Sequence, residues 1–103
     1  MRERTRAAKM ELRFYMDPET GQPHILDHGV TEAEVHEVLR GPSEYRAGDE
    51  NSRVAIGQTG AGRYLKVIYA RDAVGDGVFV ITAYDLAEKQ LKAFKRRQRR
   101  KQR

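Results

Sequence analysis

The chain has 103 residues, of which 39% are hydrophobic, no cysteine, and a net charge of +5 at neutral pH. This length suits one domain with a single modest core and is too short for two cores. The lack of cysteine excludes disulfides, a thiolate nucleophile and cysteine-ligated zinc. No apolar run approaches the roughly 20 residues of a membrane-spanning helix, so we expect a cytoplasmic protein that does not contact a membrane.

The positive charge is concentrated at the two ends of the sequence. Residues 1–9 have a net charge of +3 and residues 92–103 of +8, whereas residues 10–91 have −6. We therefore divide the chain into a basic N-terminal arm (1–10), one domain (11–94) and a basic C-terminal tail (95–103). A basic tail attracts polyanions such as nucleic acid or an acidic protein. The alternative is a solvated, partly disordered segment without a specific contact.

The first part of the domain predicts a strand followed by a short helix. Residues 11–16 alternate between polar and apolar side chains, as a half-buried strand does. Turn-forming residues follow. Pro23 suits the first position of a helix and Gly29 suits a left-handed stop, so we expect a short helix between them.

The sequence contains a start signal and a stop signal for a second helix. Thr31 and Glu34 have the spacing of a capping box, in which each side chain bonds the backbone of the other residue. An apolar stripe follows at helical spacing. The Gly-Pro pair that begins at Gly41 should end the helix.

The second part of the domain predicts a three-stranded meander. Three segments rich in β-branched and aromatic residues lie between glycine-containing breaks, at residues 53–57, 64–70 and 78–84. Residues 44–47 could add a short edge strand. Asp85 opens a last helix, whose apolar face carries Ala87, Leu91 and Phe94. The predicted order is β-α-α-β-β-β-α, an α+β domain with helices packed on one face of a mainly antiparallel sheet.

The register of the first hairpin decides which side chains share a face of the sheet. With a connection of even length, Gly57 lies opposite Lys66, and Val54 and Ile56 join the apolar residues of the next strand. Arg53 then shares the other face with Lys66. We prefer this register because an odd connection would split the apolar residues between both faces. It predicts one face for the core and another, with Arg53 and Lys66, for function.

Two histidines raise the question of a metal site. His24 and His28 are one turn apart on the first predicted helix, and such a pair can bind zinc. A closed site needs further ligands, and on an α-helix Asp27 projects about 100° away from His28. The closely spaced glycines lie in a predicted hairpin rather than before a helix, so they do not form a phosphate-binding loop. We expect neither a metal nor a cofactor.

The remaining candidates for chemistry are His28 at a helix end and four residues on strands, Arg53, Tyr64, Lys66 and Tyr84. Arg53 and Lys66 could bind phosphate and stabilise the charge that develops at a scissile phosphodiester. His28 or Tyr84 could transfer protons. The alternative is purely structural: Arg53 pairs with a neighbouring acid, Lys66 is solvated and Tyr84 packs.

The order of these motifs resembles a family of bacterial toxins. Residues 28–30, His-Gly-Val before a Thr-capped helix, are similar to the Lys-His-Gly-Val signature of BrnT-type toxins. Residues 53–57, 66–69 and 80–84 follow in the order of that family. The resemblance covers about residues 11–94 and extends to a related domain family of unknown function. Both families have the RelE/ParE-like toxin fold.

The resemblance implies a small, metal-independent endoribonuclease of a type II toxin–antitoxin system, neutralised by a cognate antitoxin that can also bind DNA. The family's helix-end histidine falls on His28 and its arginine on Arg53. Two positions depart from the pattern. The lysine before the histidine is Asp27 here, which would repel phosphate. The arginine that ends the last strand is Tyr84, as it often is in the related uncharacterised family.

Cleavage without a metal restricts the reaction. The ribose 2′-hydroxyl must attack its own phosphate, so the substrate is RNA and the product a cyclic phosphate. Arg53 and Lys66 would stabilise the phosphorane, and His28 or Tyr84 would serve as base or acid. Because the body is acidic, the tail would recruit RNA, or the ribosome would position it. The tail residues that we assign to nucleic-acid binding are Lys95, Arg96, Arg97, Arg99 and Arg100.

The alternative function is a binding module of the same fold that has no catalytic activity. Its basic tail would tether it to RNA, DNA or an acidic partner. An antitoxin-like reading frame next to this one would favour the toxin over the binding module.

Overall fold

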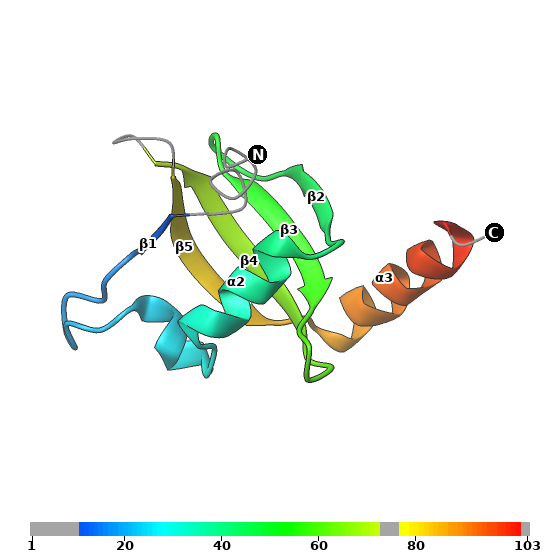
Figure 1. Cartoon of the computed structure of the whole chain (residues 1–103), viewed down its shortest axis with the longest axis horizontal. Helices are drawn as coiled ribbons and strands as arrows, with labels where there is room; N and C mark the ends of the chain where they lie inside the picture. The colour runs from blue at the N-terminus through cyan, green and yellow to red at the C-terminus, as the bar shows by residue number, and fades with distance from the viewer. Residues whose placement is uncertain (1–10, 73–76, 102–103) are drawn as a thin grey trace, which may run out of the picture.

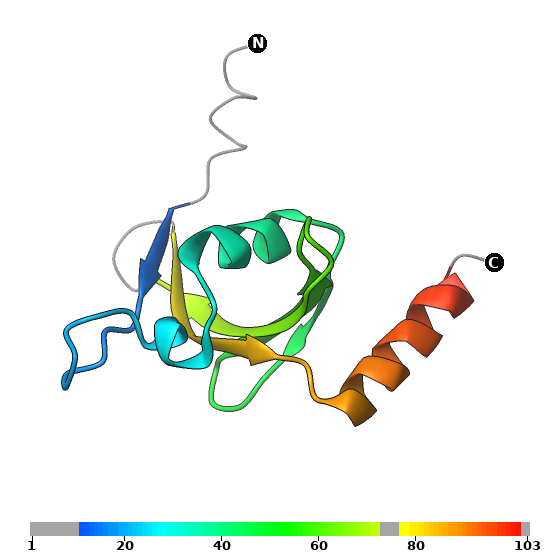
Figure 2. The same ribbon diagram turned by 90° about the horizontal axis from the view of Figure 1, so that it is seen from below.

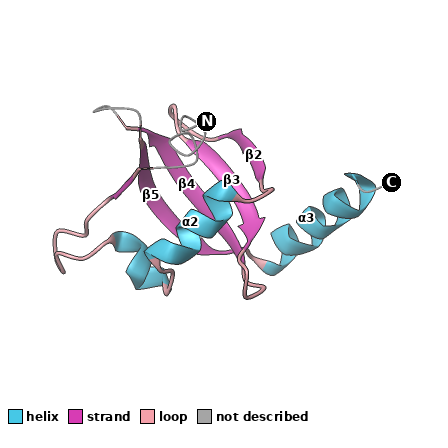
Figure 3. Cartoon of the chain, in the orientation of Figure 1, coloured by secondary structure: helices cyan, strands magenta, loops and turns pink. Residues whose placement is uncertain are grey.

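The computed structural model describes residues 11–72 and 77–101, and the predicted N-terminal arm lies outside this part. The described chain forms a five-stranded mixed sheet in the order β1-β5-β4-β3-β2 (Figures 1 and 3). The strands are β1 (Leu12–Phe14), β2 (Glu44–Ala47), β3 (Arg53–Gln58), β4 (Tyr64–Arg71) and β5 (Val78–Asp85). The helical elements are the 3₁₀-helix η1 (His24–His28) and the α-helices α2 (Glu32–Arg40) and α3 (Glu88–Lys101).

The α+β class and the three-stranded meander β3-β4-β5 are as predicted, and β2 is the edge strand that the sequence allowed. The strand pairs β2–β3, β3–β4 and β4–β5 are antiparallel. β1 is parallel to β5, which makes the sheet mixed. The first predicted helix is a single 3₁₀ segment, ended by Gly29 at φ 72° as expected of a left-handed stop. Among the described residues, no helix has the length and apolar character needed to cross a membrane.

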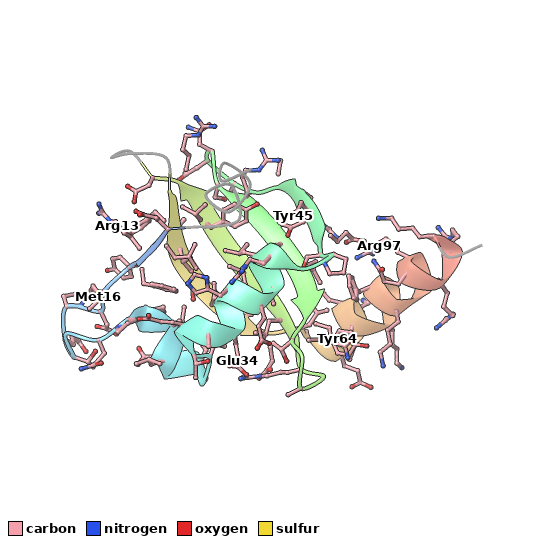
Figure 4. All side chains as sticks on the ribbon, in the orientation of Figure 1. Arg13, Met16, Glu34, Tyr45, Tyr64 and Arg97 are labelled. Carbon is pink, nitrogen blue, oxygen red and sulfur yellow. The ribbon has the colours of Figure 1, made fainter. Side chains whose placement is uncertain are left out.

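The start of α2 confirms the capping box. Thr31 Oγ1 accepts a hydrogen bond from the Glu34 N–H at 3.2 Å, and Glu34 Oε1 accepts one from the Thr31 N–H at 3.0 Å. An N-cap of this kind stabilises a helix by about 1 kcal/mol. At the other end of α2, the Tyr45 hydroxyl lies 3.1 Å from the Leu39 carbonyl oxygen, to which it donates. Because Tyr45 belongs to β2, this contact fixes the edge strand to the helix (Figure 4).

The predicted register of the β3–β4 hairpin is wrong by one residue. Ile56 lies opposite Lys66, and the Thr59 N–H donates to the Arg63 carbonyl at 2.8 Å across a three-residue loop. Gly62 has φ 98°, and a glycine in this region ends the common three-residue hairpin loop. The connection is therefore odd. Arg53 lies three residues before Ile56 on an unbroken strand, so it faces the opposite side from Lys66.

The odd register divides the apolar residues between two faces, and a helix covers part of each one. On the first, which we call the α2 face, the sheet packs against α2 and η1. Its buried cluster is Ile25, Val30, Val35, Val38, Leu39, Ala55, Leu65, Val67, Val80 and Ala83. On the second, which we call the α3 face, the buried cluster is Val54, Ile56, Leu86 and Phe94. The prediction of helices on one face only is therefore wrong.

α3 begins later than predicted and leaves the body of the domain. Asp85 is the last residue of β5 rather than a helix cap, and Ala87 is exposed rather than part of the apolar face. Figure 2 shows α2 in the hollow of the curved sheet and α3 extending away from it. The apolar contact of α3 with the sheet is made by the buried Phe94 and the half-buried Leu91. Residues 95–101 of the predicted tail are thus the continuation of a regular helix.

Candidate active site

The structure brings three of the four predicted catalytic side chains together. Lys66 on β4 and Tyr84 on β5 are opposite each other in the sheet, and the Lys66 ammonium lies 5.9 Å from the centre of the Tyr84 ring. His28, the last residue of η1, also contacts Tyr84, with ring centres 5.7 Å apart and planes at 66°. The three residues, which we call the His-Tyr-Lys group, come from three elements that meet at the end of β5.

Lys66 and Tyr84 open into a cleft on the α3 face. The cleft holds about 490 Å³ and lies between the β2–β3 connection and α3. Val54 and Ile68 contribute an apolar floor. A half-buried apolar floor with a cationic rim can accept a nucleobase or ribose while a phosphate stays at the rim.

Two arginines of this cleft share one carboxylate. Arg97 on α3 donates to both oxygens of Glu44, at 2.7 and 2.8 Å, and Arg46 donates to Glu44 Oε1 at 2.6 Å (Figure 4). The hydrogen bond from Arg97, with the one from Arg46, holds the pKa of the Glu44 carboxyl below its usual value. Lys66 and Asp49 also line the cleft, so three cations face two carboxylates there and leave a net charge of +1, where a phosphate can bind.

Arg53 does not join the His-Tyr-Lys group. Its strand position pairs with Tyr69 and faces away from Lys66, and its side chain is exposed at the start of β3. The prediction that Arg53 and Lys66 share a functional face is therefore wrong. The error came from the assumption that only one face of the sheet could be apolar.

The five tail cations have different environments along α3. Arg97 points toward the sheet and is held by Glu44, whereas Arg96, Arg99 and Arg100 are exposed. Lys95 is also exposed, with its ammonium 5.2 Å from the centre of the Tyr64 ring. Arg96, Arg99 and Arg100 have the spacing of one side of an α-helix. The charge available to a polyanion is therefore on the outward side of α3.

Arg63 is a residue of this region that we did not predict from the sequence. Its guanidinium donates to Asp85, at 2.8 and 3.2 Å, to Glu34 Oε1 at 2.9 Å and to the Gly29 carbonyl at 2.8 Å. These bonds raise the pKa of Arg63, chiefly through Asp85. Because Gly29 follows His28 and Asp85 follows Tyr84, Arg63 fixes the backbone beside both of these side chains.

A second group lies at the start of η1. The two atoms nearest to His24 Nδ1 in this group are Asp27 Oδ2 at 3.4 Å and Asp17 Oδ2 at 3.6 Å. From the sequence we expected Asp27 to lie away from the histidines, because we assumed an α-helix there. In a 3₁₀-helix, side chains three residues apart lie above one another, so Asp27 meets His24.

The His-Tyr-Lys group supplies the types of side chain that phosphodiester transfer without a metal requires. Imidazole and phenol groups can take and give protons, and an ammonium group can stabilise a negative phosphorane. Comparison of the chain with protein-family models, with curated proteins and with solved structures found no match.

Proposed function

We propose that the protein is a toxin-like endoribonuclease of a type II toxin–antitoxin system, built on a RelE-like fold and related to the BrnT-type toxins. The observation that supports this proposal is that Tyr84 contacts both His28 and Lys66, and that Tyr84 and Lys66 line a cleft with a cationic rim. Each side chain comes from a different element, and each is of a type that RNA cleavage uses.

In the proposed reaction, the ribose 2′-oxygen attacks the adjacent phosphorus while the bond from phosphorus to the 5′-oxygen breaks. His28 accepts the 2′-hydroxyl proton, and Tyr84 gives a proton to the departing 5′-oxygen. Lys66 stabilises the extra negative charge of the phosphorane. The products are a 2′,3′-cyclic phosphate and a free 5′-hydroxyl. Proton exchange with water restores His28 and Tyr84.

RNA would reach this group through the cationic surfaces around it. The body of the domain is acidic, with a net charge of −6 over residues 10–91. The outward side of α3 is basic and exposed, and Arg46 and Arg97 line the cleft. We propose that α3 binds the RNA backbone and the cleft receives the nucleotide that is cleaved, either on free RNA or on RNA positioned by the ribosome. A cognate antitoxin would neutralise the activity.

A non-catalytic binding module is the second candidate. It is favoured by the position of Arg53 on the opposite face of the sheet. Of the two predicted catalytic cations, Lys66 alone lies beside Tyr84. It is also favoured by the outward cations of α3, which need no catalytic group to bind a polyanion.

Cleavage of RNA in chelator-containing buffer separates the two candidates. We expect purified wild-type protein to give 2′,3′-cyclic phosphate and 5′-hydroxyl ends, alone or with ribosomes. Loss of one charge-stabilising donor costs about 10²–10³ in rate, so Lys66→Met should lose that much. His28→Gln and Tyr84→Phe should lose about 10²–10⁴.

Arg53→Ala is the matched control, because this exposed cation lies on the opposite face. It should keep the cleavage rate within a few-fold of wild type. Wild-type protein that binds RNA and leaves it intact under both conditions would establish the binding module instead.

A further inference from the structure

Three metal-ligating side chains converge outside the His-Tyr-Lys group, and we call them the Asp-His-Asp cluster. Asp17 comes from the turn after β1, and His24 and Asp27 come from η1. One ligand atom from each residue lies within 4.8 Å of the other two. The cluster is at the end of the domain that lies away from α3, near the turn where Figure 4 labels Met16.

The local structure explains why these side chains meet. His24 and Asp27 are three residues apart, which places them above one another on a 3₁₀-helix. The turn before η1 is closed by the Gly21 N–H, which donates to the Asp17 carbonyl at 2.8 Å, and by the Met16–Pro23 bridge. This closure brings Asp17 back to the first turn of η1. Its side chain is only 18% exposed.

The separations within the cluster are those of ion pairs, and they also fit the ligands of a metal ion. His24 Nδ1 lies 3.4 Å from Asp27 Oδ2 and 3.6 Å from Asp17 Oδ2. An N–H···O hydrogen bond is about 2.7–3.2 Å long. Two ligands of a tetrahedral zinc ion, each about 2.0–2.2 Å from the metal, are about 3.3–3.6 Å apart. The two distances from His24 therefore match the edges of a zinc coordination polyhedron.

The charges of the cluster also favour a bound cation. Asp17 and Asp27 bring two carboxylates to the same imidazole nitrogen, and a divalent cation between them would relieve the repulsion of these like charges.

We propose that Asp17, His24 and Asp27 form a binding site for a divalent transition metal, with Zn²⁺ as the ion to test. Two carboxylate oxygens and one imidazole nitrogen are a donor set that zinc accepts, and three protein ligands leave a further position for water. The site does not take part in the proposed cleavage. It clamps the turn after β1 to η1, and η1 ends in His28, whose ring centre is 5.2 Å from that of His24.

Zinc titration by calorimetry, on protein first treated with chelator and without RNA, tests the site. We expect wild-type protein to bind one Zn²⁺ per chain with a dissociation constant below about 10 μM. His24→Gln and Asp27→Asn should each weaken binding at least tenfold. Zinc should raise the unfolding temperature of wild-type protein and not that of these variants. Co²⁺ should give a visible absorption spectrum that both variants lose.

Glu19→Gln and His36→Gln are the controls, since they remove the same kinds of group from outside the cluster. They should bind zinc as wild type does. Circular dichroism verifies that each variant is folded, and Asp27 is exposed enough to be replaced without loss of the fold. A dissociation constant for zinc above about 10 μM, or one that is equal in wild type and both cluster variants, would overturn the proposal. Either result leaves the RNA cleavage test unaffected.

Discussion

The guanidinium of Arg63 spans both carboxylate oxygens of Asp85, and the same group reaches across to Glu34 and the Gly29 carbonyl. One side chain from the end of the β3–β4 loop thus joins the end of β5, the first turn of α2 and the end of η1. A planar guanidinium is suited to this role because it donates in several directions at once. Asp85 and Gly29 directly follow Tyr84 and His28 in the chain, so we infer that this junction positions both side chains.

Arg63→Ala should therefore lower both the free energy of unfolding and the rate of the proposed RNA cleavage. The side chain is 29% exposed and pairs with an exposed Asp85, so we expect a loss of about 1–2 kcal/mol in the free energy of unfolding. Urea denaturation measures this loss. Arg63→Lys should restore less than half of it, because an ammonium cannot make the same set of bonds. Cleavage should fall mainly in kcat, and an unchanged kcat would show that the junction does not position the His-Tyr-Lys group.

The stability of the domain should decrease in acid. Three carboxyl groups that bond to arginines have pKa values below their usual values in the folded protein: Asp85 through Arg63, Glu34 chiefly through the Thr31 N–H and then Arg63, and Glu44 chiefly through Arg97. A lowered pKa means that the unfolded chain binds more protons than the folded protein in this range. The free energy of unfolding therefore rises with pH there.

Urea midpoints measured between pH 7 and pH 3 check this dependence. We expect the stabilisation to be fully present above about pH 5 and to be lost as the pH falls through the folded-state values. Glu34→Gln should be less stable at pH 7 and should show a shallower decline. A decline of equal steepness in Glu34→Gln and wild type would mean that Glu34 does not contribute.

The sequence predicted those elements whose signals are local. Thr31 and Glu34 defined the start of α2, and Gly29 defined the end of η1, because caps depend on residues within one turn. To predict the register of the hairpin, we had to know whether a second apolar face of the sheet is covered. Phe94 of α3 covers this face, and it lies 38 residues after Ile56 in the sequence. No pattern around Ile56 reports this distant contact.

Only part of the candidate site was predicted, because the rest of it also depends on contacts between residues far apart in the sequence. Lys66 and Tyr84 were selected as strand residues, and their pairing follows from the β4–β5 register. Arg53 was placed wrongly because the register was. Arg63 was missed because its partners lie 22, 29 and 34 residues away along the chain. Asp27 was excluded because the sequence does not distinguish a 3₁₀-helix from an α-helix in five residues.

Phe94→Ala should detach α3 from the sheet. Phe94 is buried among Val54, Ile56 and Leu86, and truncation of such a side chain costs about 3–5 kcal/mol in a well-packed core. We expect about 2–3 kcal/mol here, because the cluster is small and lies at the edge of the domain. Hydrogen exchange should show lost protection of the α3 amides while β4 remains protected.

Lys92→Ala on the exposed side of the same helix is the control for this experiment. It should change the free energy of unfolding by less than about 0.5 kcal/mol. If Phe94→Ala instead unfolds the sheet and α3 in one step, α3 is an integral part of the domain rather than an appended arm.

The outward cations of α3 should account for the salt dependence of RNA binding. Each phosphate contact on single-stranded RNA contributes about −0.7 to the slope of log K against log salt concentration. The triple variant Arg96→Gln/Arg99→Gln/Arg100→Gln should therefore flatten the slope by up to about 2. Arg97→Gln should flatten the slope by less than one third of the change in the triple variant, because Arg97 is held by Glu44.

A second triple variant, Arg40→Gln/Arg53→Gln/Arg71→Gln, removes the same charge from exposed positions on other elements. Salt titrations of fluorescence anisotropy with a labelled single-stranded RNA measure all the slopes. We expect the second triple variant to keep the wild-type slope, because RNA should contact the cations of α3 and not these three positions. Equal flattening in both triple variants would show that RNA responds to net charge alone, and the assignment of binding to α3 would then be wrong.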